Sequence, residues 1–268
     1  MNRVYLKDKV AVITGGASGI GLATCWELAR QGARIAMLDM DEKNLYVQQQ
    51  VFSDQGYQIL VIVCDVTKEV DCNAAINQVL NEFGKIDILF NNAGITQRGL
   101  FEKTDIAVFR KVMDVNFFGS LYCTKAALPN LIQTKGIIVV NESIAGVAPL
   151  LGRTGYSASK HALNGLFTSL RCELRHKGVH VMIVCPGFIR TNLQTRALGS
   201  DGKIAGHAQT MVGKADTPEN AARQIVKGII KKKPILVITF IGKLGYLVSR
   251  LFPLLYERIM TRQFKKEL

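Results

Sequence analysis

The strongest constraint on the fold is the regular alternation of short apolar runs with longer amphipathic runs. Apolar runs of strand length occupy residues 9–16, 34–39, 58–65, 86–94, 136–143, 179–187 and 235–240. Three- and four-residue apolar spacing predicts helices over 21–32, 41–55, 68–83, 105–132, 156–177 and 218–230. Strands that are apolar throughout are covered on both faces, and this alternation requires right-handed crossovers. The sequence therefore predicts a single α/β domain, a doubly wound parallel sheet of about seven strands with helices on both faces.

Positive charge is concentrated at the end of the chain. The 268 residues carry a formal net charge of +13, and ten Lys and Arg against two Glu give residues 227–268 a net charge of +8. The basic character belongs to this tail and not to a broad face, so we expect no nucleic-acid partner. We place the folded domain at 1–242 and a basic, amphipathic C-terminal extension at 243–268.

Cysteine usage and hydropathy indicate a cytoplasmic protein. The six cysteines are scattered, with no C-x-x-C pair and no metal-ligand spacing, so we expect reduced thiols and no metal site. The first apolar run, VAVIT, is too short for a signal peptide. No run approaches the roughly 18 apolar residues of a membrane-spanning helix.

A glycine-rich loop follows the first predicted strand and reads TGGASGIG at 14–21. Glycines at this turn let the backbone approach a pyrophosphate, and the N-terminus of the next helix offers free N–H groups. Asp39 ends the second predicted strand, where a carboxylate can accept hydrogen bonds from the adenosine ribose and repel a 2′-phosphate. The pattern predicts a Rossmann-like dinucleotide site that favours NAD over NADP.

Tyr156 and Lys160 lie one helical turn apart in the sequence YSASK, so they share a helix face. An ammonium about 4 Å from the phenol is worth roughly 4 kcal/mol at an effective dielectric constant of about 20. Since one pKa unit corresponds to about 1.4 kcal/mol, this lysine would lower the tyrosine pKa from about 10 towards neutrality. The spacing alone also fits a packed tyrosine beside a solvated lysine.

With these motifs in place, the chain resembles the classical short-chain dehydrogenase/reductase family over roughly residues 7–240. The sequence NNAG at 91–94 matches the family's fourth-strand motif, and PGFIRT at 186–191 resembles the segment that holds the nicotinamide end. The resemblance implies an NAD(P)-dependent oxidoreductase that interconverts a secondary alcohol and a ketone, with NADP as the less favoured cofactor.

The resemblance also implies four catalytic residues. Tyr156 would be the general acid/base, Lys160 would lower its pKa and bind the nicotinamide ribose, and Ser143 would hold the substrate oxygen. Asn116 would carry a proton relay through water to the lysine. The cofactor-binding residues expected from the glycine loop and the resemblance are Gly15, Ser18, Gly19, Ile20, Gly21, Asp39, Asp65, Val66, Asn92, Ala93, Gly94, Tyr156, Lys160, Pro186, Gly187, Ile189 and Thr191.

Four charged or ionisable side chains near these motifs have simpler interpretations. Glu142 stands where the family often has a second serine, and we expect it to face away from Ser143 and to pair with a nearby base. His161 is expected to be structural. Arg98 and Arg153 flank the expected cleft and could meet an anionic group, but solvated charges at the rim are the simpler expectation.

The predicted substrate site is apolar. The loop 144–152 is almost wholly apolar, and residues 192–216 lack clear periodicity, as expected of a mobile lid over a cleft. A steroid, a retinoid or a fatty-acyl-derived compound would fit. Apolar walls are common to most small-molecule pockets, so the sequence does not select the molecule.

Two other functions use the same fold. A regulatory or scaffold protein would bind the nucleotide without turnover, but retention of all four catalytic residue types argues against it. An isomerase or epimerase would use bound NAD transiently, but the region after the sixth predicted strand is too short for a nucleotide-sugar domain.

The C-terminal extension combines an apolar helical stripe with Lys243, Arg250, Arg258 and Arg262, and Pro253 should break or kink its helix. Such a segment can lie in a membrane interface. It can also pack on the domain or across the interface of a homodimer or homotetramer, which is the slightly favoured alternative. The apolar positions are Leu244, Leu247, Val248, Leu251, Leu255, Ile259 and Met260.

Overall fold

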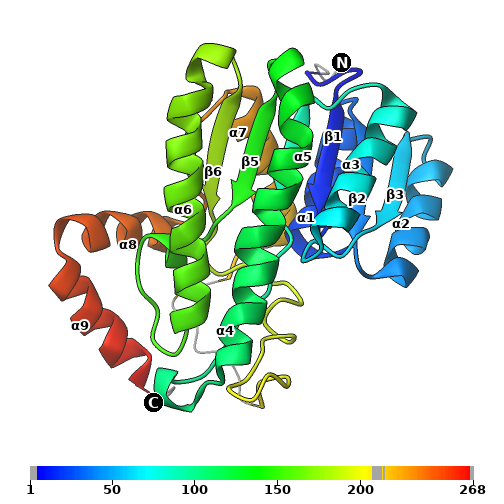
Figure 1. The fold of residues 1–268 in the computed structure, drawn as a ribbon. Helices are drawn as coiled ribbons and strands as arrows, with labels where there is room; N and C mark the ends of the chain where they lie inside the picture. The colour runs from blue at the N-terminus through cyan, green and yellow to red at the C-terminus, as the bar shows by residue number, and fades with distance from the viewer. Residues whose placement is uncertain (1–4, 207–212, 214, 266–268) are drawn as a thin grey trace.

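The computed structural model describes residues 5–206, 213 and 215–265. Seven parallel strands form one sheet in the order β3-β2-β1-β4-β5-β6-β7 (Figure 1). This is the doubly wound arrangement of a Rossmann-like fold, so the predicted fold class is confirmed. The strands are β1 (Val10–Thr14), β2 (Arg34–Asp39), β3 (Ile59–Val63), β4 (Ile88–Asn91), β5 (Ile137–Asn141), β6 (His180–Cys185) and β7 (Ile235–Val237).

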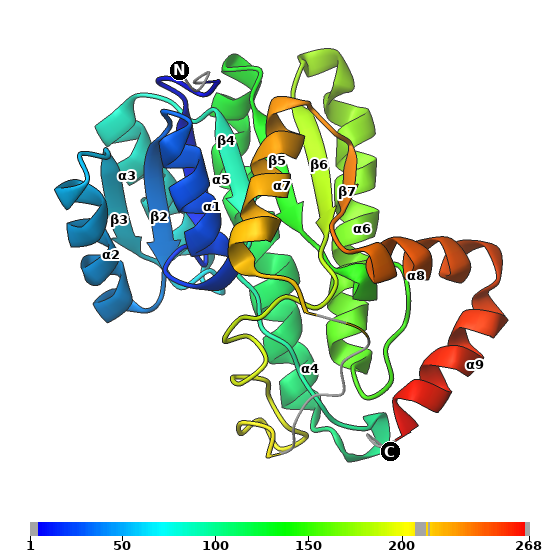
Figure 2. The same cartoon turned by 180° about the vertical axis from the view of Figure 1, so that it is seen from behind.

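Helices cover both faces of the sheet (Figures 1 and 2). One face carries α1 (Gly19–Arg30), α2 (Glu42–Asp54) and α7 (Pro218–Ile230). The other carries α3 (Glu69–Phe83), α4 (Ile106–Met113), α5 (Gly119–Gln133) and α6 (Thr154–Leu174). Short helical turns follow at Phe101–Lys103, Asp114–Phe118, Ile144–Gly146 and Arg175–Lys177.

The strands supply two apolar cores because their side chains alternate between the two faces. Val10 and Val12 of β1 contribute to the core under α3, α5 and α6. Ala11 and Ile13 contribute to the core under α1, α2 and α7. Burial on both faces explains why the strands have no polar alternation.

The predicted helix over 105–132 is interrupted, which the apolar spacing does not reveal. A π-helical turn at Asp114–Phe118 separates α4 from α5 and contains Asn116. The Asn116 side chain accepts a hydrogen bond from Ile95 N (2.8 Å) and donates one to Ile95 O (3.0 Å). The widened turn brings this amide to the backbone after β4, and π-turns of this kind are frequent at functional sites.

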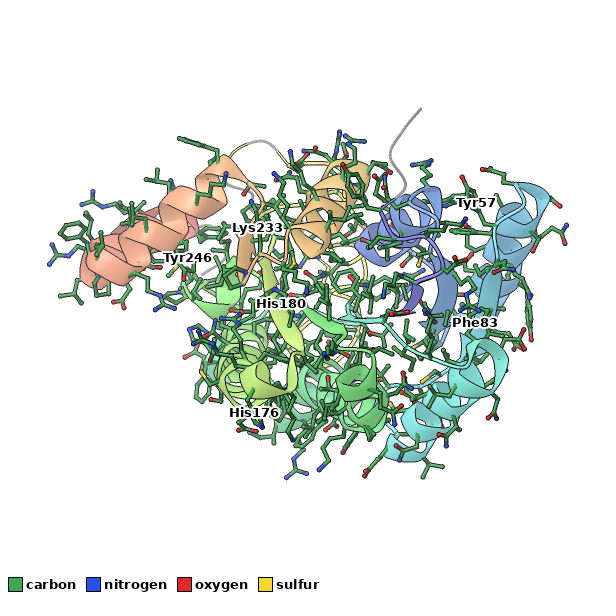
Figure 3. The ribbon with its side chains drawn as sticks, turned by 90° about the horizontal axis from the view of Figure 1, so that it is seen from above. Tyr57, Phe83, His176, His180, Lys233 and Tyr246 are labelled. Carbon is green, nitrogen blue, oxygen red and sulfur yellow. The ribbon has the colours of Figure 1, made fainter. Side chains whose placement is uncertain are left out.

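Two helices after β7 form a C-terminal arm, α8 (Phe240–Leu251) and α9 (Pro253–Gln263). Pro253 opens the second helix, so the predicted break occurs there. The predicted strand over 235–240 is shorter than expected, because Thr239 caps α8 through its hydroxyl. Figure 3 places Tyr246, on α8, at the opposite end of the molecule from Tyr57. Within the described residues, no helix is long and apolar enough to cross a membrane.

Asp87 joins the beginnings of β1 and β4 at the edge of the sheet away from the site. Its buried carboxylate accepts hydrogen bonds from Lys9 Nζ (2.7 Å) and Val10 N (3.0 Å), and Lys85 Nζ lies 3.2 Å away. Burial acts to raise the pKa of Asp87, but the hydrogen bonds from Lys9, Val10 and Lys85 outweigh it and hold the pKa below its usual range. The ionised carboxylate therefore stabilises the folded state.

Asp87→Asn should lower the free energy of unfolding at pH 7 by about 1–2 kcal/mol, because hydrogen bonds to a charged group are lost and the partly exposed lysines are screened by solvent. Because the pKa of Asp87 is lower in the folded state than in the unfolded state, its stabilising effect is fully present above the unfolded-state pKa. The effect is lost as pH falls through the folded-state pKa. Urea unfolding should thus show the parent–variant difference shrinking below about pH 4. A constant difference from pH 7 to pH 3 would contradict this role, and exposed Asp54→Asn is the control.

Candidate active site

A large cleft lies at the carboxyl ends of the strands, where doubly wound folds bind ligands. Its volume is about 1350 Å³, and its walls come from the glycine loop, the ends of β4 and β5, the loop after β6 and the C-terminal arm. This volume exceeds that of a usual small-molecule pocket and has room for a dinucleotide and a second molecule.

The glycine loop is shaped by two positions that exclude a side chain. Gly19 has φ +55°, a conformation that L-residues rarely adopt. A Cβ on Gly21 would overlap the carbonyl oxygen of Gly15, so α1 packs directly on the loop. Ser18 is the N-cap of α1 and makes no side-chain capping hydrogen bond, which leaves the first-turn N–H groups for an anion.

Asp39 has two functions at the end of β2. Its carboxylate accepts hydrogen bonds from Ala17 N (3.0 Å) and Asp41 N (3.1 Å), so it fixes the glycine loop. It also lines the cleft, together with Met40 and Asp41. The hydroxyl groups of a ligand in the cleft can therefore donate hydrogen bonds to a carboxylate whose position the backbone already fixes.

Asn92 connects the ends of neighbouring strands. Its Nδ2 donates to the carbonyl oxygens of Thr14 and Gly15, each at 3.0 Å. Its Oδ1 accepts from Asn141 Nδ2 at 2.9 Å, and Thr14 Oγ1 accepts from the backbone N–H groups of Asn92 and Ala93. The Asn92 side chain thus supports the glycine loop, while the segment 92–94 lines the cleft.

The other predicted cofactor residues line the cleft, except Gly21. Asp65 accepts hydrogen bonds from the backbone and hydroxyl of Thr67 and lines the cleft with Val66. A Cβ on Gly19 would stand 3.2 Å from Thr191 Cγ2, so the segment after β6 closes over the loop. Gly21 lies behind the cleft wall. The remaining lining residues from the prediction are Gly15, Ser18, Ile20, Ala93, Gly94, Pro186, Gly187 and Ile189.

Ser143, Tyr156 and Lys160 gather in the cleft from β5 and α6. Lys160 Nζ donates to the carbonyl oxygen of Asn141 (2.7 Å) and lies 5.7 Å from the centre of the Tyr156 ring. Burial lowers the pKa of Lys160 to about 8, although the nearby Glu142 carboxylate acts to raise it. An amine with this pKa changes its charge near physiological pH.

The pKa of Tyr156 differs from the prediction. Burial raises the pKa of this phenol above its usual range, while the Ser143 hydroxyl and the Arg153 guanidinium act to lower it. The predicted lowering by Lys160 is thus wrong for this structure, because loss of water around the phenol dominates. The protonated phenol is the stable form at neutral pH.

Ser143 has φ +146° and ψ 163°, a backbone conformation that is strained for any residue but glycine. Its hydroxyl accepts a hydrogen bond from Ala145 N (3.1 Å), which begins the short turn Ile144–Gly146. Strained residues of this kind concentrate at functional sites, where the surrounding structure holds them. Here the conformation aims the hydroxyl at Tyr156.

Asn116 lies behind the cleft wall and is fully buried. Besides its two bonds to Ile95, its Nδ2 donates to Ser159 Oγ (2.9 Å). A Cβ on Gly94 would lie 3.1 Å from Asn116 Oδ1 and 3.7 Å from Lys160 Nζ, so the amide is close to the lysine. The structure places Asn116 where it supports the site, and its predicted role in a proton relay stays a prediction.

Glu142 is buried, and its observed partner is an amide. Both carboxylate oxygens lie within 3.2 Å of Asn164 Nδ2 on α6. The prediction that it pairs with a base is wrong, since Lys160, Arg250 and Arg171 act on it only at longer range. Burial raises the pKa of Glu142 to about 7, although Asn164 and these cations act to lower it.

Two arginines predicted to be solvated at the rim are buried instead. Arg98 donates to the carbonyl oxygen of Gln194 and is 4% exposed, and Arg153 is 3% exposed. Arg153 lines the cleft near Tyr156. Sequence spacing gives no measure of burial, so it could not show this. His161 is exposed and contacts Ser157 O through Nδ1, in agreement with a structural role.

Asn141 and Gln97 also contribute to the site, although neither belongs to the motifs described above. Asn141 holds Lys160 through its backbone and Asn92 through its side chain, and its Oδ1 has no hydrogen-bond partner in the described part of the chain. Gln97 Oε1 accepts from Tyr156 N (3.1 Å), which orients the start of α6. A polar residue at the end of an apolar strand was the available signal for Asn141.

The profile described as short chain dehydrogenase matches residues 9–200. The chain is 34% identical to Dehydrogenase/reductase SDR family member 7B of Xenopus tropicalis over 98% of this chain and 88% of that protein. It is 39% identical to 11-beta-hydroxysteroid dehydrogenase-like 2 of Arabidopsis thaliana over 70% of this chain and 61% of that protein. The chain belongs to the short-chain dehydrogenase/reductase family and is an NAD(P)-dependent oxidoreductase.

Solved structures share the fold. A short chain dehydrogenase/reductase from Burkholderia phymatum in complex with NAD superposes with a TM-score of 0.83 and 24% identity, over 94% of this chain and 96% of that chain. Levodione reductase gives a TM-score of 0.77 at 23% identity, over 90% of this chain and 98% of that chain.

Glu142→Gln should raise the free energy of unfolding above that of the parent, by an amount that grows as pH rises. A raised folded-state pKa means that the contribution of Glu142 is fully present below its unfolded pKa of about 4.3 and lost as pH rises through about 7. The uncharged Gln avoids that loss, which is on the order of 3–4 kcal/mol. Chemical unfolding should show a gain over the parent that grows from pH 5 to pH 8. Exposed Glu82→Gln is the control, and an equal gain at both pH values would contradict the assignment.

Proposed function

We propose that this protein interconverts a secondary alcohol and a ketone on an apolar substrate, with NAD as its preferred cofactor. The observation that carries the proposal is the convergence of Ser143, Tyr156 and Lys160 on a cleft that also holds the glycine loop. The fit of the cofactor is supported by the uncapped start of α1 and by the unpartnered Asn141 Oδ1 in the cleft. When bound, NAD would accept the hydride in alcohol oxidation, and its reduced form would donate the hydride in ketone reduction.

The chain's own residues position and protonate the substrate. The Ser143 hydroxyl hydrogen-bonds the substrate oxygen and holds it beside the Tyr156 phenol. In ketone reduction the phenol donates its proton to that oxygen, and in alcohol oxidation the phenolate accepts it. Lys160, held on Asn141 O, lies beside the ring and carries a positive charge there below its pKa of about 8. Because burial raises the pKa of Tyr156, the resting phenol suits reduction, and oxidation should accelerate with rising pH.

The substrate end of the cleft is mostly apolar, which supports a steroid, a retinoid or a fatty-acyl-derived compound. Its walls come from three segments far apart in sequence, and the buried Arg153 side chain also lines it. The Arabidopsis relative is named as 11-beta-hydroxysteroid dehydrogenase-like, which supports a steroid or similar apolar substrate. The apolar lining residues include Ile144, Leu150, Phe188, Leu193, Leu244, Val248, Ile259 and Met260.

Tyr156→Phe should leave NAD affinity nearly unchanged and reduce turnover at least ~100-fold, since general acid–base groups contribute about that much or more. Lys160→Ala should reduce both turnover and NAD affinity. Turnover is followed by reduced-nicotinamide absorbance over a panel of apolar ketones and alcohols, and affinity by calorimetry. Tyr57→Phe, remote from the cleft, is the control. A Tyr156→Phe enzyme within a few-fold of the parent would disprove the acid–base role. A parent protein that binds NAD tightly but turns over no substrate would support the regulatory alternative.

The parent should prefer NAD to NADP, because the Asp39 carboxylate repels a 2′-phosphate and residues 40–42 supply no arginine to bind it. Asp39→Ser should narrow or reverse the preference, measured as the ratio of kcat/KM with the two cofactors. Asp39→Asn removes the charge while keeping an acceptor for Ala17 N, so it should act in the same direction. Equal efficiency with both cofactors in the parent would contradict the role of Asp39.

A further inference from the structure

The outer face of α8 exposes a continuous apolar stripe. Phe240, Leu244, Leu247 and Leu251 are spaced by four, three and four residues, so they lie on one side of the helix. Their exposed fractions are 81%, 53%, 54% and 60%. Single exposed apolar residues are ordinary, but a row of four large ones marks an interaction surface.

The exposed apolar surface continues past the end of α8 into α9. Phe252, Leu254 and Leu255 follow the stripe directly, and each is at least half exposed. Figures 1 and 2 show the two helices of the arm projecting from the side of the domain next to α6. We call the exposed apolar residues 240, 244, 247, 251, 252, 254 and 255 the arm face.

The inner side of the arm is already held by the domain, so the arm face is not an accident of a detached helix. Gly242 is buried where a Cβ would stand 3.3 Å from Ile144. Met260 Sδ accepts a hydrogen bond from Leu151 N (3.1 Å), and Phe264 is 3% exposed. Both ends of the arm thus contact the loop after Ser143, while the arm face stays exposed.

Positive charges accompany the arm face. Residues 240–265 contain Lys243, Arg250, Arg258, Arg262 and Lys265 against a single acid, Glu257, and all six are exposed. In a two-fold pairing of arms, these like charges would face their own copies and repel. An anionic lipid surface has the opposite charge and also accepts apolar side chains.

We propose that the arm face docks on an anionic lipid bilayer, with α8 and α9 lying in the plane of the interface. The helices have 12 and 11 residues, so each is about 17–18 Å long and lies on a bilayer without crossing it. The leucines and phenylalanines enter the acyl boundary, and the lysines and arginines contact the head groups.

The docked arm has a consequence for substrate entry, which rests on the proposed function. Val248, Tyr256, Ile259 and Met260 of the arm line the catalytic cleft, and so do Phe240 and Leu244 of the arm face. The arm face is therefore continuous with the cleft at Phe240 and Leu244. An apolar substrate dissolved in the bilayer can enter there without crossing water.

Co-sedimentation of the full chain with phosphatidylcholine vesicles, with and without phosphatidylserine, tests the proposal without requiring turnover. The parent should sediment with the anionic vesicles and far less with the neutral ones, and high salt should weaken binding. The double variant Leu247→Glu/Leu251→Glu should bind at least ~10-fold more weakly, since it places two charges at the apolar contact. Neither residue lines the cleft.

Two matched control pairs separate the arm face from general surface effects. Val47→Glu/Val51→Glu makes the same change on exposed positions four residues apart on α2 and should bind like the parent. Arg258→Gln/Arg262→Gln should weaken binding several-fold, whereas Arg223→Gln/Lys227→Gln on α7 should not. Circular dichroism and thermal unfolding establish that each variant is folded.

Three results would overturn the proposal. The parent could stay in the supernatant with anionic vesicles at low salt, or the Leu247/Leu251 variant could bind as well as the parent. The third result would show that a second copy of the chain, and not a bilayer, binds the arm face. If sedimentation velocity shows a parent dimer that the Leu247/Leu251 variant converts to a monomer, with lipid binding absent or unchanged, the arm face is a subunit interface. Turnover of a water-soluble ketone, measured separately, distinguishes any of these failures from failure of the proposed chemistry.

Discussion

Asn92 and Asn141 together hold the glycine loop and Lys160 in one unit. Parallel strands end side by side, which leaves backbone carbonyl groups without ladder partners at that edge of the sheet. Asn92 binds the carbonyls of Thr14 and Gly15, and its own oxygen accepts from Asn141. Asn141 O in turn accepts from Lys160. Any shift of the β1 loop relative to α6 must break this chain of hydrogen bonds, so the two halves of the site stay in register.

The site depends on this rigidity because its ionisable groups are buried. Loss of water raises the pKa of Tyr156 and of Glu142 and lowers that of Lys160 to about 8. In each case burial disfavours the charged form, and neighbouring groups only partly offset it. Buried titratable groups reduce the stability of the fold, and the strained backbone of Ser143 adds to that cost. Two apolar cores and clamps such as Asp87 supply the compensating stability.

The C-terminal arm links the site to the outside of the molecule. Its inner residues complete the apolar end of the cleft, and its outer residues are exposed and accompanied by cations. Gly242, Met260 and Phe264 attach it to the loop that follows Ser143. A partner that moves the arm therefore acts on the shape of the substrate end, while the cofactor end is fixed by the hydrogen bonds of Asn92.

The sequence by itself determined the sheet, the order of its helices and the residues that meet at the carboxyl ends of the strands. These follow from local periodicity and from short motifs whose spacing is set within one turn or one strand.

Other features depend on residues that are distant in sequence, and only the tertiary structure decided them. The π-turn joins the Asn116 amide to the Ile95 backbone, and the Glu142 carboxyl after β5 accepts from Asn164 on α6. Arg98 and Arg153 are buried by segments that no local pattern places, and the apolar residues of the arm divide between cleft and solvent according to where β7 directs α8. Burial and electrostatic environment are properties of the packed chain, so a pattern of residue types could predict which residues line this cleft but not their pKa values.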